Sequence, residues 1–248
     1  MGKTVAIIQA RMTSSRLPGK VLADLGGKPL IERMIARVRR ARALDAIWLA
    51  TTAKTTDDPL ATLCDRLGVP VHRGDEHDVL ARFLGAARAA EADIVVRLTA
   101  DCPMSDPALI DEIVADYGKG GADYVSNVLV RTYPDGLDVE VFSCAALEDA
   151  AANATEPFHR EHVTPWLQTG FRPGLATGRF RVRHVVNDID LGVMRWTVDE
   201  AEDLDLIRKL FAALPEGFAW RDALALVSVN GELARRSRVP EAYLKAAS

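Results

Sequence analysis

The sequence predicts an α/β protein with a Rossmann-like, mostly parallel mixed sheet flanked by helices. In its first half, short apolar runs alternate four times with longer amphipathic segments. Such alternation is typical of parallel strands joined by right-handed helical crossovers. The pattern changes after residue 122, where strict apolar–polar alternation predicts a mixed part of the sheet or a small cap. We therefore expect one domain over residues 1–248, with a small substrate-covering portion around 123–190.

The individual elements follow from this pattern. Buried strands are expected at residues 5–8 and 46–51, further strands at 69–74 and 93–98, and half-buried strands at 137–142 and 181–186. Helices are expected at residues 29–38 and 57–67, from 78, 107 and 200 onward, and over 220–227. Pro29 and Pro107 stand at helix starts, where the missing N–H of proline costs nothing.

The composition is that of an ordinary globular chain, with 248 residues of which 48% are hydrophobic and 27% charged. A net charge of -4 argues against general nucleic-acid binding, which favours a basic face. Neither a membrane span of ~18 apolar residues nor a secretory signal is expected. The three cysteines are far apart and lack metal-ligand spacing, so we expect a reduced, cytoplasmic protein.

The loop after the first strand is the most informative stretch. It combines three cations, two serines and a Pro-Gly turn: Arg11, Ser14, Ser15, Arg16, Gly19 and Lys20. Ligands of open α/β sheets bind at the carboxyl ends of the strands, and arginine and lysine suit phosphate oxygens. We predict that this loop binds a polyphosphate; the alternative is a solvated basic turn. It is not a Walker loop, because the sequence contains no G-x-x-x-x-G-K-[ST].

Two acidic residues, Asp101 and Asp199, follow predicted strands. Magnesium prefers hard oxygen ligands and often takes only one or two protein carboxylates, with phosphate and water completing its shell. Two aspartates at neighbouring strand ends would meet that need. Each residue also has a structural alternative: Asp199 with Glu202 forms a capping-box pattern, and Asp101 could be a turn residue ahead of Pro103. The residues alone leave both alternatives open.

The run A-R-M-T-S-S-R-L-P-G-K at residues 10–20 resembles the N-terminal signature of the CMP-sugar synthetases. These are the cytidylyltransferases that activate KDO and acylneuraminates, and the branch named after spore coat polysaccharide biosynthesis protein F is the most similar. The resemblance extends to about residue 210. It implies a fold of the nucleotide-diphospho-sugar transferase type. It also implies transfer of CMP from CTP to a sugar acid or sugar-like acceptor, with release of pyrophosphate, in surface polysaccharide or glycoconjugate biosynthesis.

In that family the loop wraps the triphosphate of CTP. The resemblance therefore implies nucleotide contacts from Ala10, Arg11, Ser14, Ser15, Arg16, Gly19 and Lys20. Asp101 matches the metal-binding aspartate after the central strand. Residues 198–204, V-D-E-A-E-D-L, resemble the V-D-x-x-E-D-L segment, whose first aspartate, here Asp199, also holds the metal. Magnesium is thus the implied cofactor, and Arg11, Arg16, Lys20 and Asp101 are the implied catalytic residues.

Residues 73–80, R-G-D-E-H-D-V-L, are closer to the spore-coat and acylneuraminate pattern than to the S-G-T-D-R run of the KDO enzymes. The expected contacts with cytosine and ribose are Arg73, Asp78 and Thr99. The acceptor side is expected among residues 135–140 and 159–164, with contacts from Glu140, Arg160 and His162. Of these, Arg160 could clamp a carboxylate or phosphate.

CTP and a small sugar-acid-like acceptor are the expected ligands, with no nucleic acid or membrane as partner. Two alternatives remain in the choice of reaction: a nucleotidyltransferase that uses another NTP, or a nucleotide-sugar-dependent glycosyltransferase of related fold. The second would more typically carry D-x-D where this chain has Asp101-Cys102-Pro103. A non-catalytic nucleotide-binding protein is disfavoured because all the expected cations and acids occur together. The C-terminal segment either packs on the domain or contacts a second subunit, so a homodimer is one expected state.

Overall fold

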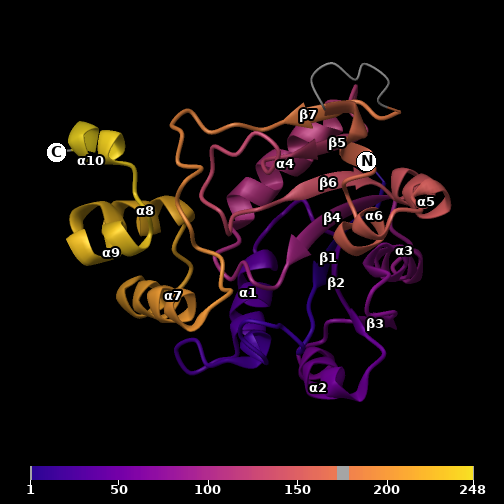
Figure 1. Ribbon diagram of the computed structural model, residues 1–248, viewed down its shortest axis with the longest axis horizontal. Coiled ribbons are helices and arrows are strands. Elements are labelled where there is room, and N and C mark those ends of the chain that lie inside the picture. Colours follow the sequence, from indigo (N-terminus) through magenta and orange to yellow (C-terminus); the bar gives the residue numbers. More distant parts are fainter. Residues whose placement is uncertain (1, 172–178, 248) are drawn as a thin grey trace.

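A computed structural model describes residues 2–171 and 179–247, which contain a seven-stranded sheet covered by helices on both faces (Figure 1). The strand order is β3-β2-β1-β4-β6-β5-β7. Their bounds are β1 Thr4–Gln9, β2 Ala46–Thr52, β3 Val71–Gly74, β4 Ile94–Thr99, β5 Tyr124–Ser126, β6 Glu140–Ser143 and β7 Val182–His184. Strands β1 to β4 are parallel, β6 runs antiparallel to both β4 and β5, and β7 is parallel to β5. The prediction of a mostly parallel mixed sheet is confirmed.

Six helices begin within one residue of the predicted positions, whereas the helices over residues 144–153, 231–236 and 241–247 were not predicted. Their bounds are α1 Leu30–Val38, α2 Asp58–Arg66, α3 Val79–Ala89, α4 Pro107–Gly118, α5 Cys144–Asn153, α6 Pro157–His162, α7 Ala201–Ala213, α8 Trp220–Val229, α9 Gly231–Arg236 and α10 Glu241–Ala247. In α1 the buried side chains recur every three or four residues, at Leu30, Ile31, Met34, Ile35 and Val38. This spacing places one apolar stripe against the sheet.

Strand β1 is buried on both faces. Its residues Ala6 and Ile8 pack with α1, α2 and α4, whereas Val5 and Ile7 pack with α3 and α5. A strand covered on both sides needs apolar side chains at every position, which is why it appears in the sequence as an unbroken apolar run. Because side chains alternate along a strand, Gln9 continues the row of Val5 and Ile7 on the α3 face.

The later part of the chain extends the same sheet. Strands β5 and β7 lie at the edge beyond β6 (Figure 1). Strand β6 begins at Glu140, three residues later than predicted. Asn127 explains the delay, because its side chain accepts from the Val139 N–H at 2.9 Å and donates to the Leu137 carbonyl at 2.9 Å. These bonds hold the residues before β6 in a loop.

The C-terminal helices pack on the domain. Trp220 and Val227 of α8 and Leu233 of α9 belong to the core that also contains α1 and α7. The N–H of Trp220 donates to the buried carboxylate of Asp106 at 2.8 Å, which joins α8 to the start of α4. Across residues 2–171 and 179–247, no helix combines the length and apolar character needed to cross a membrane.

Candidate active site

The loop between β1 and the short 3-10 helix Lys20–Leu22 is closed by its own backbone. The N–H of Gly19 donates to the Met12 carbonyl at 2.8 Å, and Gly19 has φ 73°. A left-handed backbone of this kind favours glycine, so the Pro-Gly turn is needed for the loop to fold back. The closure delivers Lys20 to the floor of the loop, where it is buried.

Asp57 anchors the loop from below, and sequence reasoning missed it. Its carboxylate accepts from the Met12 N–H at 2.8 Å and from the Thr51 hydroxyl at 2.9 Å, and it also bonds Thr52. Burial raises the pKa of Asp57, but hydrogen bonds from Thr52, Met12 and Thr51 outweigh that effect and keep the pKa below its ordinary value. The Thr-Thr pair at the end of β2, six and five residues before Asp57, was the available signal.

Asp57→Asn is expected to lower the free energy of unfolding at pH 7 by about 1–3 kcal/mol, because an amide nitrogen would face donors in a buried site. The lowered pKa means that Asp57 contributes stability above its unfolded pKa near 4 and loses it as the pH falls through the folded value. The difference between wild type and variant should therefore shrink below about pH 4. Urea unfolding at several pH values measures it. The neighbouring, more exposed Asp58→Asn is the control, and a pH-independent difference would contradict the assignment.

A cleft of about 250 Å³ opens above this loop at the carboxyl ends of β1 and β4. It is lined by Gln9, Ala10, Arg11, Ser14, Ser15, Arg16, Lys20, Val21, Thr99, Ala100 and Asp101. The structure thus brings together most of the residues expected to contact the triphosphate. Gly19 shapes the loop behind the cleft instead of lining it.

Lys20 occupies the centre of the charged groups. Its ammonium donates to the Val198 carbonyl at 2.6 Å and to Asp199 Oδ1 at 3.0 Å, and lies 3.5 Å from Asp101 Oδ2. Arg16, which is about half exposed, approaches the same Asp199 oxygen at 2.9 Å. Two carboxylates from distant parts of the chain therefore share one buried cation.

Asp101 and Asp199 are the two residues with metal-ligand character here. Their carboxylates are hard oxygen donors brought to one cation, which is the chemistry that magnesium prefers. The described part of the chain contains no group of three or more His, Cys, Asp or Glu side chains arranged to hold a metal. Magnesium at these two carboxylates would need further oxygens from a phosphate ligand and from water. Both Asp199 oxygens already have partners, Oδ1 in Lys20 and Arg16 and Oδ2 in Arg195, so magnesium would reach Asp199 only if Arg16 or Lys20 turned toward the phosphates.

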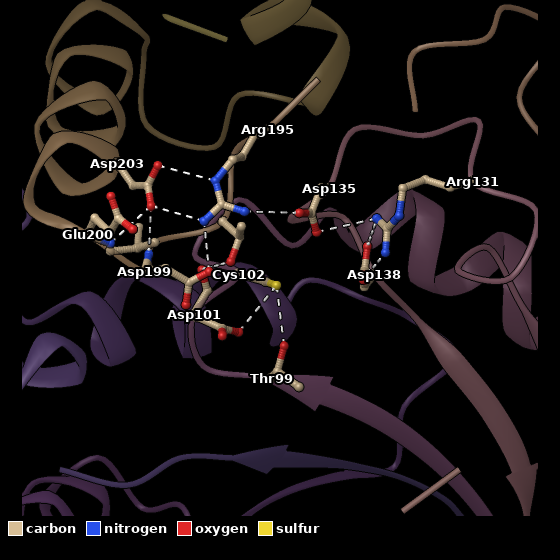
Figure 2. Close-up of polar contacts among 12 residues, drawn as sticks. Thr99, Asp101, Cys102, Arg131, Asp135, Asp138, Arg195, Asp199, Glu200 and Asp203 are labelled. Atoms are coloured by element: carbon tan, nitrogen blue, oxygen red, sulfur yellow. Dashed lines mark hydrogen bonds and ion pairs between the residues drawn. The ribbon is translucent and has the colours of Figure 1, made fainter. Parts of the chain in front are cut away.

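The capping-box alternative for Asp199 and Glu202 is wrong. Helix α7 begins at Ala201 with Glu200 as its N-cap, one residue later than that alternative requires. The box residue is Asp203, whose carboxylate accepts from the backbone N–H groups of Asp199 at 2.9 Å and Glu200 at 3.0 Å (Figure 2). The side chain of Asp199 consequently does not cap α7 and instead accepts a hydrogen bond from Lys20.

Arg195 supports Asp199 from the other side. It donates to Asp199 Oδ2 at 2.8 Å and to Asp203 Oδ2 at 3.1 Å, and it reaches Asp135 Oδ2 at 3.4 Å (Figure 2). Burial raises the pKa of Asp199, but hydrogen bonds from Arg195 and Lys20 lower it below its ordinary value. Asp199 therefore stays ionised. Sequence reasoning missed Arg195, because the segment before α7 is not helical and the i,i+4 spacing therefore gave no signal of a contact with Asp199.

The acceptor segment that the sequence predicted begins beside this network. Arg131 binds the Asp138 carboxylate through two hydrogen bonds, at 2.7 and 2.8 Å, and lies 3.4 Å from Asp135 (Figure 2). Burial, and secondly the nearby charge of Asp138, raise the pKa of Asp135. Through Arg195, the segment around Asp135 and Asp138 is connected directly to Asp199.

Other expected contacts lie outside the cleft. Arg73 donates to the carbonyls of Thr52 and Lys54 and to the Asp58 carboxylate. Asp78 caps α3 by accepting from the Ala81 N–H at 2.9 Å, and it forms an ion pair with Arg160. The residue expected on the nucleotide side and the one expected on the acceptor side thus bind each other.

The two remaining acceptor candidates differ in exposure. His162 is exposed at the end of α6, with its ring centroid 4.5 Å from that of Phe158. Glu140 is buried, and both of its carboxylate oxygens already have partners. Oε1 accepts from the Tyr124 hydroxyl at 2.6 Å and the Thr164 hydroxyl at 2.7 Å, and Oε2 pairs with Arg97.

The basic loop after β1, together with carboxylates at the end of β4 and ahead of α7, forms a cleft at the carboxyl ends of the strands, which is where α/β folds of this class bind their ligands. The family model for cytidylyltransferases matches residues 5–220. The chain belongs to the cytidylyltransferase family and is an enzyme of that kind, which confirms the resemblance seen in its loop signature.

Relatives cover most of the chain. Spore coat polysaccharide biosynthesis protein SpsF of Bacillus subtilis is 34% identical over 223 residues, which cover 85% of this chain and 87% of the relative. The 3-deoxy-manno-octulosonate cytidylyltransferase of Anaeromyxobacter sp. (strain K) is 30% identical, with 86% and 99% covered. A solved cytidylyltransferase structure from Leptospira borgpetersenii has a TM-score of 0.87 at 30% identity, with 94% of this chain and 97% of that chain covered.

Proposed function

We propose that this protein transfers CMP from CTP to a sugar acid or a sugar-like acceptor and releases pyrophosphate, in the biosynthesis of a surface polysaccharide or glycoconjugate. The observation that carries the proposal is the cleft, which Arg11, Arg16, Lys20 and Asp101 line and beside which Arg16 and Lys20 pair with Asp199. The relatives support the acceptor class, because one is named for spore coat polysaccharide biosynthesis and another for cytidylyl transfer to 3-deoxy-manno-octulosonate.

In this reaction a hydroxyl oxygen of the acceptor attacks the α-phosphorus of CTP in line and gives its proton to water. The bond from that phosphorus to the bridging oxygen of the β-phosphate breaks, and pyrophosphate leaves with the electron pair. The protein contributes mainly position and charge. All three N–H donors of Lys20 already face oxygens, so binding a phosphate oxygen would replace the longest of these contacts, that with Asp101, while Val198 and Asp199 keep the ammonium in place. Arg11 and Arg16 are more exposed and would close on the phosphates as they bind.

Asp101 and Asp199 are the residues that would hold magnesium, which would neutralise charge on the phosphate oxygens. Arg195 would keep Asp199 ionised and aimed at the cleft. We place the acceptor toward Asp135 and Asp138, since Arg195 joins this segment to Asp199. Contacts from Arg160 and His162 with the acceptor, binding of the base by Arg73 and Asp78, and a homodimer stay predictions.

A pyrophosphate-release screen tests the proposal. CTP, UTP, ATP and GTP would each be offered with a panel of sugar acids, including 3-deoxy-manno-octulosonate and acylneuraminates, and of phosphorylated polyols. We expect release only with CTP and one acceptor class, with a product whose mass equals the acceptor plus CMP less water. Release with another NTP would correct the base. Consumption of a UDP- or CDP-sugar without pyrophosphate would favour the glycosyltransferase alternative.

A further inference from the structure

Gln9 is the last residue of β1 and lines the cleft, yet it was not among the residues that the sequence singled out. Its side-chain oxygen Oε1 accepts a hydrogen bond of 3.3 Å from Nη2 of Arg97 on the neighbouring strand β4. Both side chains lie on the α3 face of the sheet, because Gln9 continues the row of Val5 and Ile7 and the Arg97 guanidinium lies 5.8 Å from the ring centroid of Phe83.

Arg97 is itself held in place from behind. It forms an ion pair with Glu140, in which the two side chains are only 15% and 5% exposed. The other carboxylate oxygen of Glu140 accepts from the hydroxyls of Tyr124 and Thr164. Because an unpaired buried charge is costly, this pairing is hard to break. The chain Glu140–Arg97–Gln9 therefore forms a rigid support that runs from the interior to the wall of the cleft.

The support determines which end of the Gln9 amide faces the cleft. A guanidinium can only donate hydrogen bonds, so the Gln9 atom beside Arg97 must be the oxygen. The amide nitrogen then points away from Arg97 with two N–H donors. Within residues 2–171 and 179–247, no acceptor takes a hydrogen bond from that nitrogen. Gln9 thus offers donors, and no acceptor, to whatever occupies the cleft.

We propose that Gln9 donates to the pyrimidine ring of the bound nucleotide, at its O2/N3 edge, and that Arg97 and Glu140 are positioning residues that fix the amide for this contact. The proposal rests on the function proposed above. Two of the three cations suited to phosphate, Lys20 and Arg16, are bound to Asp199 ahead of α7, whereas the third, Arg11, pairs with Glu76. Gln9 projects on the opposite, α3 face of β1. A neutral donor there suits an uncharged ring acceptor better than a phosphate.

In this arrangement Glu140 acts on nucleotide binding indirectly, through Arg97 and Gln9. The sequence predicted a contact between Glu140 and the acceptor, but its oxygens are filled by Arg97, Tyr124 and Thr164. Its influence on the substrate passes instead through Arg97 to Gln9. Removing the Glu140 charge should consequently disturb nucleotide binding by the same route as removing the Gln9 amide, and the two effects should not add.

Isothermal titration of the full chain with CTP and, separately, with inorganic tripolyphosphate tests the contact. Gln9→Met keeps the length of the side chain, removes the donors and adds no charge. It should weaken CTP binding about tenfold, the scale of a lost hydrogen bond, and leave tripolyphosphate binding within about twofold. Unchanged CTP affinity, or equal losses for the two ligands, would overturn the proposal. If the wild-type protein binds tripolyphosphate but not CTP, the result contradicts the proposed use of CTP itself, whatever the effect of Gln9→Met.

The positioning role is tested by a double-mutant cycle with Glu140→Gln. The single variant should weaken CTP binding and spare tripolyphosphate, and Gln9→Met combined with Glu140→Gln should bind CTP no more weakly than Gln9→Met alone. If the losses of CTP affinity in the two single variants multiplied in the double variant, Glu140 would act by another route, and its positioning role would be overturned. If Glu140→Gln does not fold, as thermal unfolding would reveal, the Gln9→Met titrations still decide the base contact.

Discussion

Asp199→Asn is expected to lower turnover at least ~100-fold, because the magnesium that we place at Asp101 and Asp199 would lose a charged ligand and with it several kcal/mol of charge stabilisation. Asparagine has nearly the same shape but no negative charge. The cap of α7 should survive, since Asp203 makes it. The variant also takes a counter-charge from Lys20 and Arg195, so its free energy of unfolding should fall by about 1–3 kcal/mol.

Steady-state kinetics over a range of magnesium concentrations, below the melting temperature of the variant, measure this effect. Raising magnesium should partly restore turnover, and titration of the CTP-bound protein with the metal should show weakened affinity. Glu200→Gln is the matched control: it is the adjacent acid, lies 3.9 Å from Arg16, is largely exposed and should retain most of the activity. Near-normal turnover of Asp199→Asn at ordinary magnesium would mean that Asp199 only balances the charge of Lys20.

Lys20→Met is expected to weaken CTP binding at least ~100-fold, because it removes a buried cation that we place beside the triphosphate, where a phosphate oxygen would replace its long contact with Asp101. It also leaves Asp101 and Asp199 facing the phosphates without that cation, and like charges at short range repel. The loss should exceed that of Arg16→Ala, whose side chain is 55% exposed and more strongly screened.

Titration calorimetry with CTP, and with tripolyphosphate to isolate the phosphates, compares the two variants. Both ligands should lose affinity together in Lys20→Met, in contrast to the behaviour expected of Gln9→Met. Lys28→Met is the control, because this exposed lysine lies outside the cleft and pairs with Glu32. A folded Lys20→Met variant that binds CTP as wild type does would remove Lys20 from the nucleotide site.

Local sequence determined the parallel strands, most helices and the position of the phosphate-type loop. The apolar run at residues 5–8 implied a strand covered on both faces, and Pro18-Gly19 implied the fold-back of the loop that follows. Both features depend on residues that are adjacent in sequence, so they can be predicted without knowing the rest of the structure. The same locality explains the correct expectation that Asp101 would follow a strand at the cleft.

Only the tertiary structure decided what each side chain touches. Lys20 meets Val198 and Asp199 across 178 and 179 residues of sequence, and Gln9 meets Arg97 across 88. The choice between a cap and a cleft role for Asp199 turned on a one-residue difference in the start of α7. Glu140 and Arg160 had the chemistry of ligand-binding residues, but buried or nearby partners took their hydrogen bonds. Such pairings arise when the strands align side by side, because a buried charge must find its partner wherever the sheet brings one within reach.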